Sequence, residues 1–347
     1  MTGAARDLVL EVRDLETNYY THDGVVKAVR KVSFEIERGQ RVGVVGESGS
    51  GKSALALSIV GLIEPPGRVV GGSVVLNGRD IATFSDRQLQ QVRGREISLV
   101  FQDPMTALDP VKTIGAQIAE AILRHRPIGK RAARRNAVDL LRDVEVPHAN
   151  RRLDDYPHQY SGGMRQRVLI AIALANEPDL VIADEPTTAL DVTTQAQVLD
   201  VLERLVAERK AAVMLITHNL GVVAEFCDRV FVMYAGRLVE RAYADDLFAR
   251  QAHPYSEALL SSVLRPDRLR RGPLPTIPGV PPSLVHLPPG CPFEPRCPVG
   301  RGLDVCRTQV PPPVAVGDPA DPGVAECHFA EERWSGAVPS HASEGGT

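Results

Sequence analysis

The sequence predicts an α/β fold with a largely parallel sheet, followed by a smaller region of different composition. The continuous apolar runs 180–183 and 213–216 lie between stretches of helical periodicity, and such runs suit parallel strands buried on both faces. Sixteen of the 27 prolines lie between Pro266 and Pro322, a density that forbids long helices and central strands. We therefore expect a domain boundary near residues 250–265.

The elements follow one another in two groups. The first group consists of apolar strands separated by glycine-containing turns, expected at Leu8–Val12, Ala28–Ile36, Arg41–Val45 and Ser73–Leu76. Helical periodicity then takes over, with apolar faces at Ile114, Ile118 and Ile122 and again within Gln195–Lys210. Segments 229–234 and 237–240, around Gly236, predict a hairpin.

Composition and charge exclude several classes of protein. The chain has 347 residues and a formal net charge of −3, so nothing in its overall charge predicts a nucleic-acid partner. The basic stretch Arg124–Arg135 is interpreted as a solvated helix face. Apolar runs stay below the ~18 residues of a membrane span, and the N-terminus does not resemble a signal peptide. We expect a cytosolic protein whose membrane role depends on partners.

A glycine-rich loop predicts a phosphate site. Gly46–Ser53 fits GxxxxGK[ST], after the apolar run Val42–Val45 and before a helix-like stretch, Ala54–Leu62. Glycines let backbone N–H groups surround phosphate oxygens, and the helix N-terminus adds a positive dipole end. We expect ATP to be bound by Gly46, Ser48, Gly49, Ser50, Gly51 and Lys52, with Ser53 on Mg²⁺. A glycine-rich turn without nucleotide is the alternative, which the strand–loop–helix context disfavours.

An acidic pair after a buried strand completes the predicted hydrolytic site. Asp184 ends the run Leu180–Ala183 and is expected to hold Mg²⁺ through water. Glu185 follows directly and can orient or deprotonate an attacking water. Acidic turns after strands are common, so this interpretation depends on the phosphate loop being present.

Residues Tyr160–Arg167 resemble the LSGGQ signature of the ABC ATPase family. The rest of that family's motif set matches at Gly46–Ser53, Gln102, Asp184–Glu185, Ala189–Asp191 and His218. The resemblance covers about residues 7–250. It implies a P-loop NTPase fold, an ABC ATPase domain with a RecA-like core, an antiparallel β-subdomain and a helical signature subdomain.

The resemblance implies that two such domains dimerise head to tail, with each ATP between one P-loop and the other subunit's signature. Ser161, Gly163 and Met164 would then face the γ-phosphate of the partner's ATP. Ser161 is also a good helix N-cap, and both roles can hold together. Two positions depart from the family pattern: Tyr160 replaces Leu, and Met164 replaces Gln.

Other roles are carried over from the family one residue at a time. Gln102 resembles the glutamine that senses Mg²⁺ and the γ-phosphate, and His218 resembles the histidine that contacts the γ-phosphate. Asp191 resembles an aspartate at the dimer interface. Tyr19 resembles the aromatic residue that stacks on adenine, with Tyr20 as a close competitor.

Further stretches resemble the ATPases of dipeptide, oligopeptide and nickel importers, namely Phe101–Pro110, His253–Tyr255, Gly290–Phe293 and Arg296–Pro298. Met164–Val168 resembles the D-type member of the usual pair. This implies a heterodimer with an F-type ATPase subunit, two permease subunits and an extracytoplasmic peptide-binding protein. The chain would be a peripheral protein on the cytoplasmic face of the membrane, with the segment after Gln102 docking a permease coupling helix.

Four cysteines predict a metal site in the proline-rich region. Cys291, Cys297, Cys306 and Cys327 are separated by five, eight and twenty residues, and four thiolates on irregular loops can hold Zn²⁺ or an Fe–S cluster. Spacing wider than CxxC favours [4Fe–4S], with Zn²⁺ second and four free thiols as the alternative. Such a staple would stabilise a segment with little apolar area. Cys227 is expected to be a core thiol.

We therefore expect a nucleotide-binding domain over residues 1–255, an accessory domain over 256–335 and a disordered tail over 336–347. The predicted function is ATP hydrolysis that powers import of di- and oligopeptides. One alternative is the same role for nickel or another small solute. The others are a non-transport ABC ATPase that acts on nucleic acid and a catalytically silent regulatory subunit.

Overall fold

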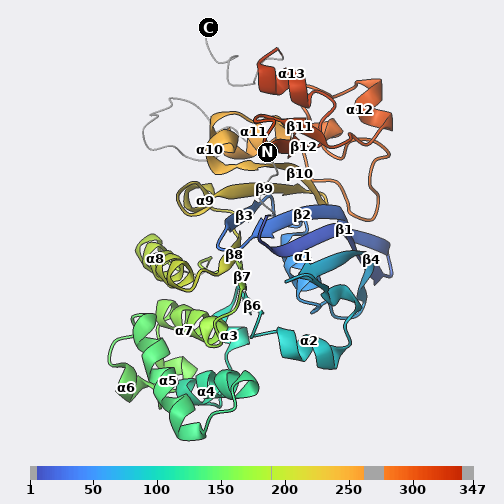
Figure 1. The fold of residues 1–347 in the computed structure, drawn as a ribbon. Coiled ribbons are helices and arrows are strands. Elements are labelled where there is room, and N and C mark those ends of the chain that lie inside the picture. The colour runs from blue at the N-terminus through green and yellow to red at the C-terminus, as the bar shows by residue number, and fades with distance from the viewer. Residues whose placement is uncertain (1–5, 189, 262–276, 338–347) are drawn as a thin grey trace.

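The computed structural model describes residues 6–188, 190–261 and 277–337, and the strands within these ranges form two sheets (Figure 1). The smaller sheet is antiparallel, in the order β2-β1-β4-β5. Its strands are β1 (Leu8–Thr21), β2 (Gly24–Glu37), β4 (Gly67–Leu76) and β5 (Arg79–Asp80). The strands expected at Leu8–Val12, Ala28–Ile36 and Ser73–Leu76 are confirmed and extend further than their apolar runs.

The larger sheet has the order β11-β12-β10-β9-β3-β8-β7-β6. Strands β9, β3, β8, β7 and β6 pair in parallel, and β10, β12 and β11 continue the sheet in antiparallel fashion. The strands are β3 (Arg41–Val45), β6 (Ile97–Val100), β7 (Leu180–Asp184), β8 (Ala212–Ile216), β9 (Arg229–Tyr234), β10 (Arg237–Tyr243), β11 (Val314–Val316) and β12 (Gly323–Ala325). The predicted parallel sheet and the β9–β10 hairpin are confirmed.

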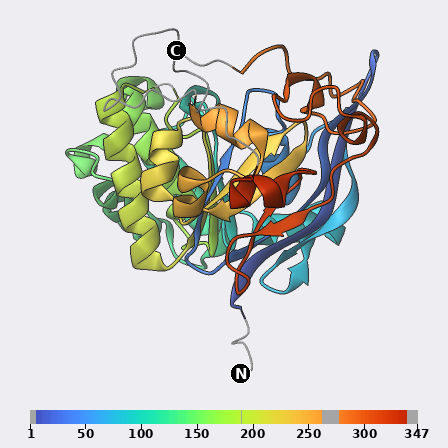
Figure 2. The same cartoon turned by 90° about the horizontal axis from the view of Figure 1, so that it is seen from above.

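Helices such as α8 (Val192–Arg209) and α9 (Leu220–Phe226) cover one side of this sheet. The antiparallel sheet lies on the other (Figure 2), where α1 (Lys52–Ile59) packs in the same core. The α-helices are α1 (Lys52–Ile59), α2 (Asp86–Val92), α3 (Pro104–Ala107), α4 (Ile114–His125), α5 (Lys130–Asp143), α6 (Ala149–Arg152), α7 (Gly162–Leu174), α8 (Val192–Arg209), α9 (Leu220–Phe226), α10 (Ala244–Ala249), α11 (Pro254–Ser261), α12 (Asp304–Thr308) and α13 (Ala330–Ser335). Short 3₁₀ turns lie at Ile81–Thr83, Pro157–Gln159 and Glu294–Arg296. Helices α3 to α7 gather at one end of the molecule, beyond β6 (Figure 1).

The central strands are buried on both faces because they separate two hydrophobic cores. Along β8, Val213 and Leu215 enter the core shared with the helices, whereas Met214 and Ile216 enter the core shared with the antiparallel sheet. Successive side chains of a strand point to opposite faces, so a run with no polar residue supplies both cores. This is the physical reason that the continuous apolar runs predicted parallel strands correctly.

The C-terminal region adds to the main sheet. Strand β12 pairs with β10, and β11 pairs with β12 at the edge. Residues 314–325 of the expected accessory domain therefore continue the sheet of the expected nucleotide-binding domain, and the boundary at residue 255 stays a prediction. Three-residue strands fit here because an edge strand needs few ladder hydrogen bonds next to prolines. Most of the expected disordered tail, residues 338–347, lies outside the described residues.

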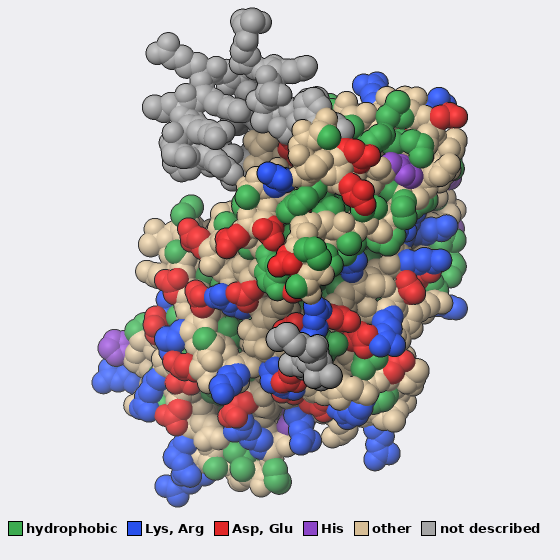
Figure 3. Space-filling model, turned by 45° about the horizontal axis from the view of Figure 1, so that its top comes forward, with side chains coloured by type: hydrophobic (Ala, Val, Ile, Leu, Met, Phe, Trp, Pro, Cys, Tyr) green, Lys and Arg blue, Asp and Glu red, His purple; other side chains and the backbone are tan. Residues whose placement is uncertain are grey.

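Of the helices in the described ranges, none combines the length and apolar character needed to cross a bilayer. Acidic and basic side chains are interspersed over most of the face drawn in Figure 3.

Candidate functional site: the nucleotide site

The glycine-rich loop runs from the end of β3 into α1, pressed against two neighbouring strands. Gly46 has φ 155° and Gly51 has φ 108°. A Cβ on Gly46 would lie 2.2 Å from the carbonyl oxygen of Met233 in β9, and a Cβ on Gly51 would lie 2.2 Å from that of Ala28 in β2. Glycine is required at both positions for backbone conformation and for space. The loop is therefore held in one fixed curve.

Lys52 is buried at the start of α1, with its ammonium inside the loop. Its Nζ donates to the carbonyl oxygens of Gly46, at 2.9 Å, and Glu47, at 3.0 Å. Burial lowers the pKa of Lys52 below its usual value, and the nearby carboxylates of Glu185 and Asp184 offset only part of this shift. The buried Ser50 Oγ has no hydrogen-bond partner among the described residues, whereas Ser48 and Gly49 are exposed. A buried cation beside an unsatisfied hydroxyl suits a phosphate group.

Asp184 and Ser53 form the expected Mg²⁺ position. Asp184 ends β7, where burial raises its pKa and a hydrogen bond from the Ser53 hydroxyl lowers it. Its buried Oδ1 has no hydrogen-bond partner in the described part of the chain. A buried carboxylate oxygen without a partner is unfavourable. This carboxylate and hydroxyl therefore fit a divalent cation.

The three residues predicted to be catalytic meet at one carboxylate. Glu185 Oε2 accepts a hydrogen bond from Gln102 Nε2 at 3.3 Å, and His218 Nδ1 lies 3.4 Å away. Gln102, Glu185 and His218 follow β6, β7 and β8, and the carboxyl ends of neighbouring parallel strands meet at one edge of a sheet. Thr188, which the sequence analysis missed, donates to the same oxygen at 2.8 Å. Its position three residues after Glu185 was the available signal.

The signature lies at the N-terminus of α7, where Ser161 is the N-cap and accepts a hydrogen bond from the Met164 N–H at 3.4 Å. A Cβ on Gly163 would lie 2.4 Å from Thr194 Cγ2 of α8, so this glycine allows the two helices to pack. Tyr160 is buried, and its hydroxyl donates to the Arg152 carbonyl at 2.8 Å. The departure from Leu thus adds a hydrogen bond to a core contact.

The remaining predicted residues lie outside this centre. Asp191 caps α8 by accepting from the Thr194 N–H at 3.0 Å and its hydroxyl at 2.7 Å. Tyr19 is half-buried, and a Cβ on Gly67 would lie 2.6 Å from its ring. Tyr20 is exposed, with the Arg68 guanidinium 5.9 Å from its ring centre. Adenine stacking by either tyrosine stays a prediction.

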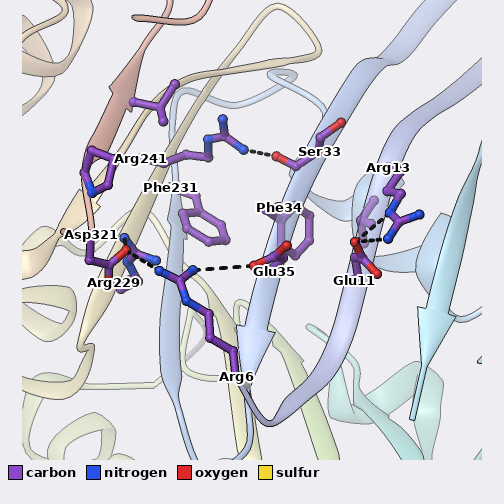
Figure 4. A pocket seen from close by; sticks show the side chains of 13 residues that line it. Arg6, Glu11, Arg13, Ser33, Phe34, Glu35, Arg229, Phe231, Arg241 and Asp321 are labelled. Carbon is purple, nitrogen blue, oxygen red and sulfur yellow. Dashed lines mark hydrogen bonds and ion pairs between the residues drawn. The ribbon is translucent and has the colours of Figure 1, made fainter. Parts of the chain in front are cut away.

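A surface pocket of about 330 Å³ lies elsewhere, between β1 and β2 on one side and β9 and β10 on the other. Arg6 bridges it, lying 3.6 Å from Glu35 and 3.0 Å from Asp321 (Figure 4). Arg241 donates to the Ser33 carbonyl. The residues that line this pocket include none of those predicted to bind nucleotide. The contacts of Arg6 and Arg241 join the C-terminal region to both sheets.

Comparison with known proteins decides the family. A family profile described as ABC transporter matches residues 29–188, and one described as oligopeptide/dipeptide transporter, C-terminal region, matches residues 239–303. The chain is 52% identical over 306 residues to a probable peptide ABC transporter ATP-binding protein, y4tR, of Sinorhizobium fredii, covering 88% of this chain and 91% of that one. The chain belongs to the ABC transporter family, among its ATP-binding proteins.

Other similar proteins agree with this. The oligopeptide transport ATP-binding protein OppD of Salmonella typhimurium is 48% identical, over 88% of this chain and 90% of its own. Among solved structures, the ATP-binding cassette MJ0796 bound to ADP and Pi has a TM-score of 0.62 and 27% identity, covering 68% of this chain and 98% of that one. The ABC ATPase fold and ATP hydrolysis predicted from the motifs are confirmed.

The cysteine region of this ABC ATPase does not show the predicted metal site. Burial, together with the nearby thiols of Cys297, Cys327 and Cys306, raises the pKa of Cys291 to about 12. The fold thus gathers the four cysteines. Within the described ranges, however, no group of three or more His, Cys, Asp or Glu residues is arranged to hold a metal ion. The Fe–S or Zn²⁺ prediction is not confirmed. Cys227 is buried, as expected.

Proposed function

We propose that this ABC ATPase powers the import of di- and oligopeptides through partner permease subunits. The observation that carries the proposal is the match of residues 239–303 to the C-terminal region of oligopeptide and dipeptide transporters. The relatives named above are peptide or oligopeptide transport ATP-binding proteins. Nickel or another small solute remains the alternative substrate, because substrate choice belongs to the binding protein and permeases.

Hydrolysis uses the residues gathered at the edge of the sheet. Lys52 and the loop N–H groups hold the β- and γ-phosphates, and Tyr19 stacks on adenine. Ser53, Asp184 and Gln102 would hold Mg²⁺, which neutralises phosphate charge when bound. Glu185 orients the attacking water and accepts its proton, while His218 contacts the γ-phosphate from the neighbouring strand.

A second ATPase subunit completes the site. Helix α7, which carries the signature at its start, lies in the helical region away from α1 (Figure 1). Ser161 and Gly163 of one subunit would therefore reach the ATP of the other, with Asp191 at the interface beside Val192, which is 84% exposed. MJ0796 is described as dimeric. We expect an F-type partner, with ATP closing the dimer and hydrolysis reopening it.

The permeases would dock on the segment that follows Gln102. Met105 is 58% exposed and Val111 is 80% exposed. Exposed apolar side chains on one short segment suit an interaction surface. Binding of a permease coupling helix there would place the chain, as a peripheral subunit, on the cytoplasmic face of the membrane. An extracytoplasmic peptide-binding protein would deliver the substrate.

For the four cysteines we propose a structural [4Fe–4S] cluster, with Zn²⁺ as the alternative. The proposal is supported by the proximity of four buried or half-buried thiols in a loop-rich segment. Iron, acid-labile sulfide and zinc should be measured after anaerobic purification, together with the visible absorption spectrum. About four irons per chain would support the cluster. Correctly folded protein without iron or zinc would remove both versions of the proposal.

The importer role is tested by uptake of labelled dipeptide, longer peptide and nickel in cells carrying the wild type or Glu185→Gln. Loss of a catalytic base should lower hydrolysis and peptide uptake about 100-fold or more, while purified Glu185→Gln still binds ATP. Wild-type peptide uptake by the variant would overturn the role of Glu185. Loss of nickel uptake alone would leave the ATPase assignment standing and refute the peptide substrate.

A further inference from the structure

Glu47, the second residue of the phosphate loop, is held by an arginine from the far end of the chain. Arg296 lies in the 3₁₀ turn Glu294–Arg296, 249 residues from Glu47. Its Nη1 donates to Glu47 Oε2 at 2.7 Å, and its Nη2 donates to Oε1 at 2.9 Å. The arginine side chain is only 4% exposed. A bidentate, largely buried pair of this kind fixes orientation as well as distance.

The guanidinium is itself held from several sides. Arg296 Nε donates to the Pro278 carbonyl at 2.8 Å, and Nη1 also donates to the Tyr234 hydroxyl at 3.2 Å. It lies 5.8 Å from the ring centre of Tyr234 and 5.9 Å from that of Phe293. These contacts hold the guanidinium of Arg296 in a single orientation, with two of its N–H groups directed at the Glu47 carboxylate.

Two further contacts fix the backbone of Glu47. Its N–H donates to the hydroxyl of Tyr255, a buried residue of α11, at 2.8 Å. Its carbonyl accepts from Lys52 Nζ at 3.0 Å. The N–H, the carbonyl and the carboxylate of one loop residue are therefore all engaged. Two of these partners, Tyr255 and Arg296, come from residues beyond 250, outside the phosphate-binding motif.

Electrostatics gives this arrangement a consequence for ATP. A carboxylate within the phosphate loop repels the β- and γ-phosphates, and at a partly buried position that repulsion is weakly screened. Arg296 neutralises this carboxylate and draws it aside. Loss of the arginine would free a negative charge in the loop and release the loop's first turn.

We propose that Arg296 is a positioning residue for nucleotide binding, which acts by holding Glu47 and through it the phosphate loop. The C-terminal segment thereby sets the affinity of the site for ATP. The inference rests on the phosphate loop being the ATP site proposed above.

The test is a titration of the purified full-length chain with a fluorescent ATP analogue and Mg²⁺. Arg296→Met keeps an apolar stem against Tyr234 and Phe293, and should weaken ATP binding about 10-fold, within the usual range for coupling between sites. Glu47→Gln in the Arg296→Met background removes the unpaired charge and should restore most of the affinity. A purely structural role for Arg296 would give no such rescue.

A matched control is available in the pair Arg333–Glu257. Arg333 Nη2 lies 2.6 Å from Glu257 Oε2, and the arginine side chain is 3% exposed. The pair joins α13 to α11. Among the described residues, the hydrogen bonds of Glu47 go to other side chains and to the loop itself. Arg333→Met should lower the melting temperature and leave ATP affinity unchanged.

Three results decide the matter. Wild-type affinity in folded Arg296→Met overturns the proposal, and so does equal weakening by Arg333→Met. Failure of Glu47→Gln to restore binding in folded protein overturns it as well. Lys52→Ala distinguishes failure of the proposed ATP site from failure of the proposed role of Arg296. Wild-type ATP binding by this variant would refute the phosphate-loop site itself.

Discussion

At the scale of single residues, Glu185 combines a strained backbone with several hydrogen bonds. Its φ of 46° lies in the left-handed region, which costs a residue other than glycine about 1–3 kcal/mol. Its N–H donates to the Ile216 carbonyl at 2.8 Å, and its carboxylate accepts from Thr188 and Gln102. These bonds offset the strain and hold the carboxylate at the edge of the sheet, where the proposed water would lie.

Ser161 has two predicted roles that substitutions can separate. Ser161→Ala removes the helix cap and should cost about 1 kcal/mol of stability. Ser161→Asp keeps a capping oxygen, so its melting temperature should stay near the wild-type value. Both variants should lower hydrolysis by roughly 100-fold in the presence of the partner subunit, since each loses a donor to the γ-phosphate.

Thermal denaturation and phosphate release, measured on the same preparations, distinguish the two roles of Ser161. Wild-type hydrolysis by a stable Ser161→Asp variant would show that Ser161 is only a cap.

At the scale of elements, the order of strands brings the residues predicted to be catalytic together. Strands β6, β7 and β8 are neighbours in the sheet, so their carboxyl ends carry Gln102, Glu185 and His218 to one edge. Helix α7 lies among the helices at one end of the molecule, apart from α1 (Figure 1). Neighbouring strands thus assemble one half of the proposed ATP site within this chain. The signature of the proposed partner subunit would supply the other half.

At the scale of the whole molecule, Asp321 ties the two ends of the described chain to the main sheet. Its Oδ1 lies 3.0 Å from Arg6 Nη2 and 3.1 Å from Arg229 Nη2. The Tyr243 hydroxyl donates to its other oxygen. Burial alone would raise the pKa of Asp321, but Tyr243, Arg229 and Arg6 together hold that pKa below its usual value.

Asp321→Asn tests this junction. The change leaves Arg229, which is largely buried, without its carboxylate, and should lower the free energy of unfolding by about 1–3 kcal/mol near neutral pH. Because the pKa of Asp321 is lower in the native than in the unfolded state, its contribution is present above the ordinary carboxyl pKa. The contribution is lost as pH falls through the native value.

The difference between wild type and Asp321→Asn should therefore stay constant from about pH 7 to about pH 5 and shrink as the pH falls below about 4. Urea unfolding of both proteins across this range measures it. A difference that stays constant on acidification would show that the carboxylate charge of Asp321 does not stabilise the fold.

The sequence by itself determined the main strands and helices and predicted those parts of the ATP site that lie within short motifs. Apolar runs such as 213–216 predicted buried strands, and Gly46–Ser53 with Asp184–Glu185 predicted the phosphate and metal positions. These predictions succeeded for the fold because side-chain period, glycine spacing and strand-to-loop order act between residues close in the chain.

Only the tertiary structure decided which distant residues meet. Arg296 and Glu47 are separated by 249 positions, and Glu240 of β10 pairs with Ala325 of β12, 85 positions further along the chain. The hydrogen bond from the Tyr160 hydroxyl to the Arg152 carbonyl was not predicted from the sequence either. Contacts of this kind depend on the path of the chain and on the pairing of buried charges. No periodic pattern in the sequence indicates either of them.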